Sequence, residues 1–314
     1  MNRRDVLTRM SAVAGLGVAT LAGLPVLAQS PKISRLVIVG GAEDRLQDRI
    51  ILRKFADYCG GSQARIRVIT AASGDPEGVW QSYRDVFRAL GVEDVQRLAL
   101  DDRDSAHQSE LQTEILQANG IFMSGGDQSK LMDTLWDTPA YQSLHQSFHM
   151  NRCCIGGTSA GAAVMSRHMI AQGPAVLRPS KEAVDTDIGL GLLSQAVVDQ
   201  HFSERRRLAR LLSTLAMRPD LLGVGIDEDT ALVIERGEAI EVIGKGTVTL
   251  VDPSQMQSNV NELETLEQIE MLGVQLHLLP AGHRYSVKSV GPSARSGPLR
   301  QAIQRLVAVG PIRG

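Results

Sequence analysis

One stretch of the sequence, CCIGGTSAGAAV at residues 153–164, contains the pattern that decides the fold class. It begins with an apolar run that predicts a strand, passes through small residues, and ends in residues that favour a helix. Gly157, Ser159 and Gly161 match the G-x-S-x-G spacing of a nucleophile elbow, in which small residues let the backbone turn sharply. The spacing alone also fits an ordinary tight turn. With a strand before it and a helix after it, the stretch favours a serine nucleophile at position 159.

Apolar runs and helical patterns alternate on both sides of this stretch. Strands are predicted at residues 35–39, 65–70, 95–100, 120–123 and 153–155. Helices are predicted at residues 46–58, 76–90, 110–118 and in a stretch that ends near 150. This order predicts a three-layer α/β fold, with a parallel sheet between two layers of helices. Glycine-rich loops follow three of the strands, at residues 40–44, 125–128 and 157–161. They are expected at one edge of the sheet, where such folds bind ligands.

The pattern changes toward the C-terminus. Residues 230–243 and 247–251 alternate between apolar and polar types and are punctuated by Gly237 and Gly244, which predicts antiparallel strands. We expect these strands to form a smaller sheet packed on the main one. Residues 298–307 predict a final helix.

The first residues predict an export signal. Residues 2–7, NRRDVL, partly match the twin-arginine pattern, and residues 11–28 form an uncharged run that ends in Val-Leu-Ala. The run contains three glycines and Pro25, which suit a permanent membrane span poorly. We therefore expect a cleaved signal at residues 1–28 and an exported, periplasmic or extracellular protein without stable membrane insertion. A retained anchor is the open alternative.

Composition limits the possible partners and cofactors. The chain has 314 residues and a net charge of -2, which excludes the broad basic surface of a nucleic-acid-binding protein. It contains an odd number of cysteines, Cys59, Cys153 and Cys154, whose spacing fits no metal site. Buried thiols are expected, and the disulfide status of Cys59 is left open.

A serine nucleophile needs a base and a group that orients the base. His201 follows an apolar run at residues 196–200, so it is expected at the same edge as Ser159. Glu228 follows a short apolar run at residues 222–226 and is the first candidate for the orienting acid. Asp185 and Asp187 are alternatives that the sequence does not rank firmly.

Two backbone groups are candidates for an oxyanion hole. The N–H of Ala160 belongs to the residue after the proposed nucleophile, at the start of the predicted helix. A second donor is expected from the loop that contains Gly126. Donors of this kind stabilise the negative charge that develops on the carbonyl oxygen.

Residues 203–212 predict a helix that begins two residues after His201. Leu208, Leu211, Leu212 and Leu215 would form its core-facing stripe. Its first turn would then lie over the site. Arginines in that turn could bind substrate carboxylates through paired N–H groups.

These residues together resemble the cyanophycinase family. The resemblance rests on the loops at 40–44, 125–128, 157–162 and 225–228, and most specifically on the DQHF-x2-R-x-R-x2-R stretch at residues 199–210. That family is grouped with the aspartyl dipeptidases among serine peptidases of a class I glutamine amidotransferase-like α/β fold. The resemblance implies a hydrolytic domain at residues 34–290, followed by a C-terminal helix and tail at residues 291–314. One departure is Arg45, where lysine is expected.

The resemblance also implies roles for individual residues. Ser159 would be the nucleophile, His201 the general base and Glu228 the orienting acid. The substrate pocket would be lined by Gln128, Asp199, Gln200, Arg205, Arg207 and Arg210. Glu43 or Asp44 would add to the acidic groups that face the substrate.

The implied substrate is cyanophycin, a polyaspartate backbone with arginine linked to each side chain. The implied products are β-aspartyl-arginine dipeptides. No metal or cofactor is required, and a homodimer is the family-based expectation.

Three other functions are consistent with parts of this pattern. An aspartyl dipeptidase of the same group would act on free dipeptides, and a periplasmic binding protein would not be catalytic. Glutaminase-type members of the same fold carry cysteine at the elbow, where this chain has Ser159. The arginine-rich motif after His201 favours cyanophycin.

Overall fold

The computed structural model describes residues 34–150, 153–174, 176–288 and 297–308, all within one compact unit, Ile33–Gly314. The predicted export signal at residues 1–28 lies outside the described residues. Residues 291–296 and 309–314 of the predicted C-terminal tail lie outside them as well.

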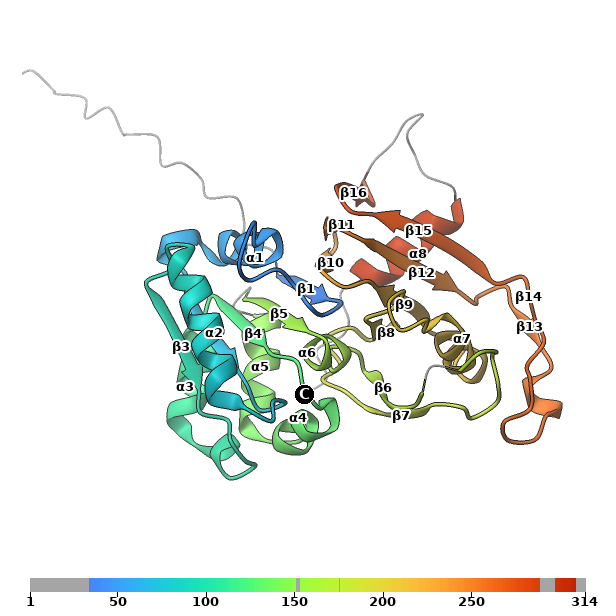
Figure 1. The fold of residues 1–314 in the computed structure, drawn as a ribbon, viewed down its shortest axis with the longest axis horizontal. Coiled ribbons are helices and arrows are strands. Elements are labelled where there is room, and N and C mark those ends of the chain that lie inside the picture. The colour runs from blue at the N-terminus through green and yellow to red at the C-terminus, as the bar shows by residue number, and fades with distance from the viewer. Residues whose placement is uncertain (1–33, 151–152, 175, 289–296, 309–314) are drawn as a thin grey trace, which may run out of the picture. The chain divides into compact units, whose positions relative to one another are not determined.

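The main sheet has eight strands (Figure 1). Its parallel part consists of the five strands that the sequence predicts. Five strands pair in parallel, in the order β1 (Arg35–Val39), β5 (Cys154–Thr158), β4 (Gly120–Met123), β2 (Arg65–Ile69) and β3 (Asp94–Leu98). Three antiparallel strands extend the sheet beyond β1, namely β10 (Thr230–Glu235), β11 (Ala239–Gly244) and β16 (His283–Ser286). The expectation that residues 230–243 belong to a smaller sheet is therefore wrong, because β10 pairs with the edge of β1 that β5 leaves open.

A second sheet contains the strand that precedes His201. Its order is β15 (Gln275–Pro280), β12 (Thr247–Asp252), β9 (Leu222–Ile226) and β8 (Ala196–Gln200). Strands β8 and β9 are parallel, so the residues that follow both strands lie at the same edge. Two short antiparallel pairs complete the set, β6 (His168–Gln172) with β7 (Asp185–Ile188) and β13 (Gln257–Ser258) with β14 (Met271–Leu272).

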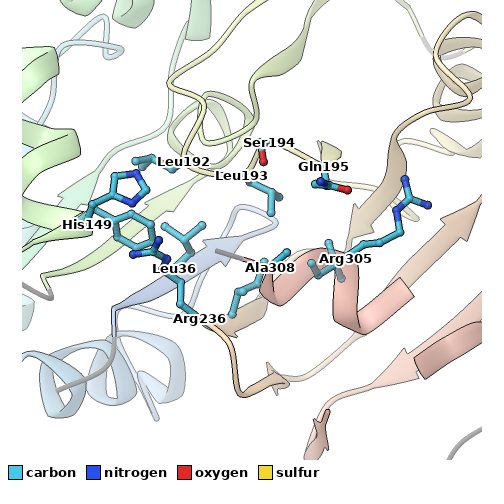
Figure 2. A pocket seen from close by; sticks show the side chains of 12 residues that line it. Leu36, His149, Leu192, Leu193, Ser194, Gln195, Arg236, Arg305 and Ala308 are labelled. Atoms are coloured by element: carbon cyan, nitrogen blue, oxygen red, sulfur yellow. The ribbon is translucent and has the colours of Figure 1, made fainter. Parts of the chain in front are cut away.

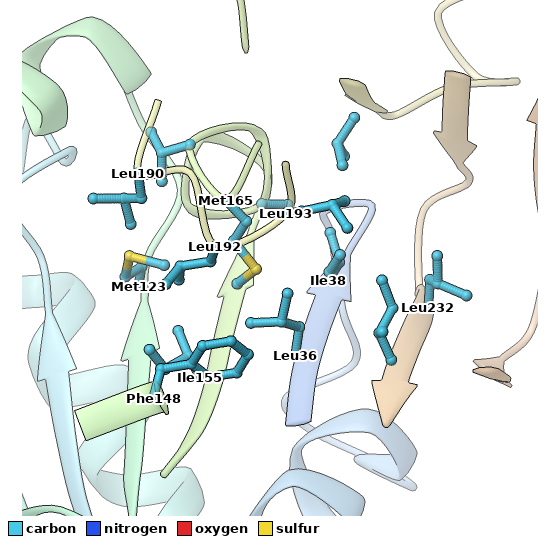
Figure 3. Close-up of a cluster of buried hydrophobic side chains, with 14 of the residues drawn as sticks. Leu36, Ile38, Met123, Phe148, Ile155, Met165, Leu190, Leu192, Leu193 and Leu232 are labelled. Atoms are coloured by element: carbon cyan, nitrogen blue, oxygen red, sulfur yellow. The ribbon is translucent and has the colours of Figure 1, made fainter. Parts of the chain in front are cut away.

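Both faces of the main sheet are covered. Leu36 and Ile38 of β1 enter one apolar cluster, and Val37 and Val39 enter another, because successive side chains of a strand point to opposite faces. Helices α1 (Ile50–Cys59) and α2 (Pro76–Ala89) contribute to the valine side. The leucine side is covered by α3 (Ser109–Gln117), α4 (Gln128–Leu135), α5 (Pro139–His149) and α8 (Gly297–Val307). Figure 3 shows part of the cluster on the leucine side, where Leu36 and Ile38 lie among side chains of neighbouring strands.

The α/β fold with a mostly parallel sheet and smaller antiparallel sheets is thus confirmed. The glutamine amidotransferase-like type stays a prediction. Helix α8 packs its apolar face into the same core as the sheet. In the described part of the chain, no helix combines the length and the apolar character that a bilayer span requires.

Several helix boundaries differ from the prediction for local reasons. The helix expected from residue 46 begins at Ile50, because the carboxylate of Asp44 accepts the backbone N–H groups of residues 46–49 and closes a loop there. The stretch that ends near residue 150 is divided into α4 and α5, since Pro139 starts a new helix with Thr138 as its cap.

The boundary of the helix after His201 differs most from the prediction. Helix α7 spans Leu208–Met217, so residues 203–207 form turns instead of the predicted first helical turn. Leu211 and Leu215 of the expected stripe are fully buried. Leu208 is exposed, because it stands at the new N-terminus.

Glycines shape the turn between β5 and the nucleophile. Strand β5 continues through Gly156 and Gly157, which pair with β1 and β4, so the strand is longer than predicted. The helix that follows, α6 (Ala160–Ala163), has only four residues. A β-carbon on Gly157 would lie 2.4 Å from the carbonyl oxygen of Gly161. The turn therefore requires glycine at this position.

We predict that Gly157→Ala destabilises the protein by about 1–3 kcal/mol, because the added methyl group forces the backbone of the turn to move. Gly74→Ala is the matched control, since Gly74 is exposed and a β-carbon there meets no atom within 4 Å. Urea unfolding of both variants measures the difference. Equal unfolding midpoints for the two variants would contradict the account of the turn.

Candidate active site

Ser159 lies in a strained turn between β5 and α6. Its backbone has φ 52° and ψ -110°, a combination that a residue with a side chain rarely adopts. The Ser159 N–H donates to the carbonyl oxygen of Val39 at 3.1 Å, and its own carbonyl accepts the N–H groups of Ala162 and Ala163. Strain of this kind persists only where the surroundings hold it, and it occurs preferentially at functional sites.

A continuous line of hydrogen bonds joins Ser159, His201 and Glu228. His201 Nε2 lies 3.0 Å from Ser159 Oγ, and His201 Nδ1 lies 2.5 Å from Glu228 Oε1. An ionised carboxylate can only accept, so the Nδ1 proton belongs to the histidine and Nε2 is left to accept from the serine hydroxyl. In this tautomer the imidazole can take the proton of a nucleophilic serine.

The alternative acids do not reach this line. Asp185 and Asp187 lie on β7, and both side chains are exposed. Asp187 instead accepts the backbone N–H of Ile188 at 2.7 Å. The structure therefore places Glu228, and not these two residues, against the imidazole.

The loop after β1 supports the histidine. The His201 N–H donates to the carbonyl oxygen of Gly40 at 2.7 Å. Gly41 has φ 105°, and a β-carbon there would lie 2.3 Å from Cε1 of the His201 ring. The absence of a side chain at Gly41 thus lets the ring pack directly on the backbone.

The loop after β4 lies against the nucleophile. A β-carbon on Gly125 would be 3.3 Å from the β-carbon of Ser159, which is tight contact. Its neighbour Gly126 has φ 141°, and a β-carbon there would meet the carbonyl oxygen of Ala72 at 2.0 Å. This contact joins Gly125 to Ser159. The two residues predicted for the oxyanion hole, Gly126 and Ala160, are the next residues along the chain from each of them.

Several residues predicted to bind substrate are engaged with one another. Arg210 forms two hydrogen bonds to the carboxylate of Asp199, at 2.8 and 2.5 Å, and a third to the carbonyl oxygen of Gly173. Arg207 contacts Asp199 at 3.3 Å and also donates to both the backbone and side-chain oxygens of Gln200. The Asp199 side chain has no exposed surface. Direct contact of Asp199 with a substrate stays a prediction, and it would require this network to open.

Gln128 and Arg205 differ in how much of each side chain is available. The Gln128 amide donates to the carbonyl oxygens of Ile170 and Ala171, which leaves its own oxygen as the available group. Arg205 is exposed, and its guanidinium makes no ion pair with any residue that the structure describes. Among the predicted arginines it is therefore the one whose charge is available to a ligand.

Glu43 and Asp44 both accept hydrogen bonds within the protein, and contact of either carboxylate with a substrate stays a prediction. Glu43 is buried and accepts hydrogen bonds from Thr158 and Tyr83. Asp44 accepts backbone N–H groups, led by that of Gln47, and these hold the pKa of its carboxyl well below the usual range. The contact with Tyr83 joins residues 40 positions apart, so no local pattern could have indicated it.

The cysteines do not belong to the site. Cys153 and Cys154 are buried thiols, as predicted, and Cys59 is buried as well. Burial raises the pKa of Cys153 to about 12, so its reactive thiolate form is scarce near neutral pH.

A separate pocket lies toward the opposite end of β1 (Figure 2). Leu36 and Ile234 line it together with Arg236 and His149, and none of the predicted site residues is among its lining residues. Burial, together with the charge of Arg236, lowers the pKa of His149 to about 4, so this histidine is neutral at physiological pH.

The fold and this site define a family. The sequence model of peptidase family S51 matches residues 36–242, and the chain belongs to that family. It is accordingly a hydrolase of the serine-peptidase type.

Individual relatives cover most of the chain. It is 40% identical to a cyanophycinase of Geminocystis herdmanii over 83% of its length and 96% of the relative's. It is 41% identical to a cyanophycinase of Synechococcus elongatus over 81% of its length and 79% of the relative's. Among solved structures, a peptidase from an acI-B1 Actinobacterium aligns with a TM-score of 0.57 and 25% identity, over 81% of this chain and 97% of that one.

We predict that Arg210→Met destabilises the protein by about 3–5 kcal/mol, because it leaves the Asp199 carboxylate buried without its main partner. Arg205→Ala is the matched control and is expected to change stability by less than about 0.5 kcal/mol, since Arg205 is exposed. Urea unfolding at neutral pH tests both. If the two variants unfold at the same urea concentration, the buried network does not have the structural role described here.

Proposed function

We propose that this protein hydrolyses cyanophycin, with Ser159 as nucleophile, His201 as general base and Glu228 as the acid that orients the base. The observation that carries the proposal is the hydrogen-bonded line through these three side chains. The substrate is proposed from the relatives, two of which are cyanophycinases at 40% and 41% identity over most of the chain.

The first half of the reaction forms an acyl-enzyme. Ser159 Oγ attacks a backbone carbonyl carbon of the polymer while His201 Nε2 takes the hydroxyl proton. The imidazolium that results is stabilised by the carboxylate of Glu228 at Nδ1. When the peptide C–N bond breaks, His201 returns the proton to the leaving amine, and the acyl group stays on Ser159 as an ester.

The second half repeats these steps with water. A water molecule gives a proton to His201 Nε2 as its oxygen attacks the ester carbon. The bond to Ser159 Oγ then breaks, and the serine oxygen regains a proton from His201. The acyl part of the polymer leaves with a free carboxylate, and β-aspartyl-arginine dipeptides result when successive backbone bonds are cut.

Backbone N–H groups stabilise both tetrahedral intermediates in this scheme. Ala160 follows the nucleophile, and Gly126 follows the glycine that contacts Ser159. Loss of one such donor typically costs about 100- to 1,000-fold in rate. The donors are backbone groups, so side-chain substitution alone does not remove them.

The turn after His201 is suited to a substrate with both charges. Arg205 offers a cation for a carboxylate of the polymer, and the neighbouring Glu204 is an exposed carboxylate for its guanidinium groups. Gln128 offers the oxygen of its side-chain amide. Asp199, Gln200, Arg207 and Arg210 support this turn from beneath through their mutual contacts.

We further propose that the protein is exported and acts on polymer released by other cells. The support is the sequence of residues 1–28, with its paired arginines and uncharged run.

We predict that the wild-type protein solubilises cyanophycin and that Ser159→Ala abolishes this activity, because no other group takes over the attack on the carbonyl. In the same assay, Arg205→Ala should raise KM more than it lowers kcat. The activities of the wild type, Ser159→Ala and Arg205→Ala are compared by measuring the release of soluble dipeptide with chromatography. Cleavage of free aspartyl dipeptides with intact polymer would instead assign the chain as an aspartyl dipeptidase. Binding of polymer without cleavage would make it a binding protein.

We also predict that replacing both Arg3 and Arg4 by lysine retains the protein in the cytoplasm, since the twin-arginine pathway requires the arginine pair. Cell fractionation with N-terminal sequencing of the exported form checks this. Normal export of the double variant, or an intact N-terminus on the exported protein, would contradict the assignment of a cleaved twin-arginine signal.

A further inference from the structure

A buried carboxylate is hydrogen-bonded to the residue that precedes the nucleophile. Glu43 has a side chain with no exposed surface. Its Oε2 accepts the hydroxyl of Thr158 at 2.5 Å, and its Oε1 accepts the hydroxyl of Tyr83 at 2.6 Å and Nε of Arg45 at 2.9 Å. Thr158 is the last residue of β5, so this contact ends directly at the turn of Ser159.

The partners of Glu43 compensate for its burial. A carboxylate without water is costly unless donors and an opposite charge surround it. Arg45 supplies the charge, and its guanidinium lies 4.4 Å from the ring centre of Tyr83. Burial and the negative charge of Glu43 raise the pKa of Tyr83, so its hydroxyl keeps its proton and remains a donor. Glu43, Arg45, Tyr83 and Thr158 thus form one cluster in which each side chain contacts at least one other.

The loop that carries Glu43 is also hydrogen-bonded to His201 and to the residue after Glu228. Gly40 accepts the backbone N–H of His201. Asp229, which follows Glu228, donates its N–H to the carbonyl oxygen of Gly41 at 2.9 Å and accepts the N–H of Asp44 at 2.9 Å. One segment, residues 40–44, is therefore hydrogen-bonded to His201 itself and to the residues adjacent to Ser159 and Glu228.

We propose that Glu43 is a positioning residue that sets the Ser159–His201 geometry by clamping Thr158 to the loop after β1. This inference rests on the proposed function of Ser159. Ser159 holds φ 52°, a conformation that needs external support. Without the Glu43–Thr158 bond, the end of β5 keeps its pairing with β1 but loses the side-chain contact that fixes Thr158 against the loop. The Oγ atom would then lose its alignment with Nε2.

The test is the rate at which a small fluorophosphonate labels Ser159, because this reaction needs the activated serine but no polymer. Thr158→Val removes the hydroxyl while keeping the shape of the side chain. We expect labelling to slow by about 10- to 100-fold, the effect of a displacement on the order of 1 Å. With cyanophycin, kcat should fall by a similar factor while KM changes less than about twofold, since the substrate-binding turn is untouched.

Three further variants complete the design. Thr158→Ser restores a hydroxyl and should recover most of the wild-type labelling rate. Thr134→Val is the matched control, because it removes a buried threonine hydroxyl that bonds to the carbonyl oxygen of Lys130, on α4. It should label as fast as the wild type. Glu43→Gln tests the carboxylate itself and is expected to slow labelling at least as much as Thr158→Val.

The outcomes separate this inference from the proposed function. No labelling of Ser159 in the wild-type protein would overturn the function on which the inference rests. Normal labelling of the wild type together with equal rates for Thr158→Val and Thr134→Val would overturn the positioning role alone. If Glu43→Gln does not fold, the comparison of the three threonine variants still decides the question.

Discussion

The site depends on one close approach, at the two glycines that end β1. A β-carbon on Gly40 would lie 2.0 Å from the carbonyl oxygen of Asp227, and one on Gly41 would overlap the ring of His201. At this point the main sheet, which carries Ser159, meets the edge of the second sheet, which carries His201 and Glu228. Any side chain at these positions would separate the serine from its base.

Two clusters built around a buried carboxylate support this contact. One lies just before His201 in the chain, and the other contacts the residue just before Ser159. Asp199 and Arg210 tie the end of β8 to α7, immediately before His201. Glu43 and Arg45 tie the loop after β1 to the end of β5, immediately before Ser159. Each cluster contains an ion pair to a buried carboxylate, and such a pair rarely adds much stability by itself. We therefore interpret both clusters as devices that fix geometry, at the two places where the backbone of a proposed catalytic residue has a positive φ.

Much of the fold could be predicted from sequence because its signals are local. Most of the parallel strands are short, largely apolar runs that end at a glycine or a turn, and the ends of such strands meet at one edge. That reasoning named Ser159, His201 and Glu228, whose side chains the structure brings together, although their catalytic roles stay proposals. The sequence made Glu228 the first candidate acid without ranking it firmly above Asp185 and Asp187, and the structure adds the 2.5 Å contact between its carboxylate and His201.

The rest depended on contacts between distant residues. Nothing in residues 230–243 shows that β10 pairs with β1 and not with β9 or β12, since an antiparallel strand reads the same in either sheet. The helix expected at residue 203 begins at Leu208, because Arg206 has φ 52°, outside the right-handed helical region, and Asp199 and Gln200 bind Arg207 in the turn. The hydrogen bonds of Glu43 to Tyr83 and Thr158 could not be predicted, because these residues lie far from Glu43 in the sequence.

The central claim is that the junction of the two sheets makes Ser159 a nucleophile. The most direct measurement is an acid quench during the first turnovers on cyanophycin, followed by mass spectrometry of the peptides. The account predicts a transient aspartyl adduct on the peptide that contains Ser159, at the position of the serine. Hydrolysis that proceeds through an adduct on another side chain, or with Ser159 unmodified at every quench time from the first turnover onward, would contradict it.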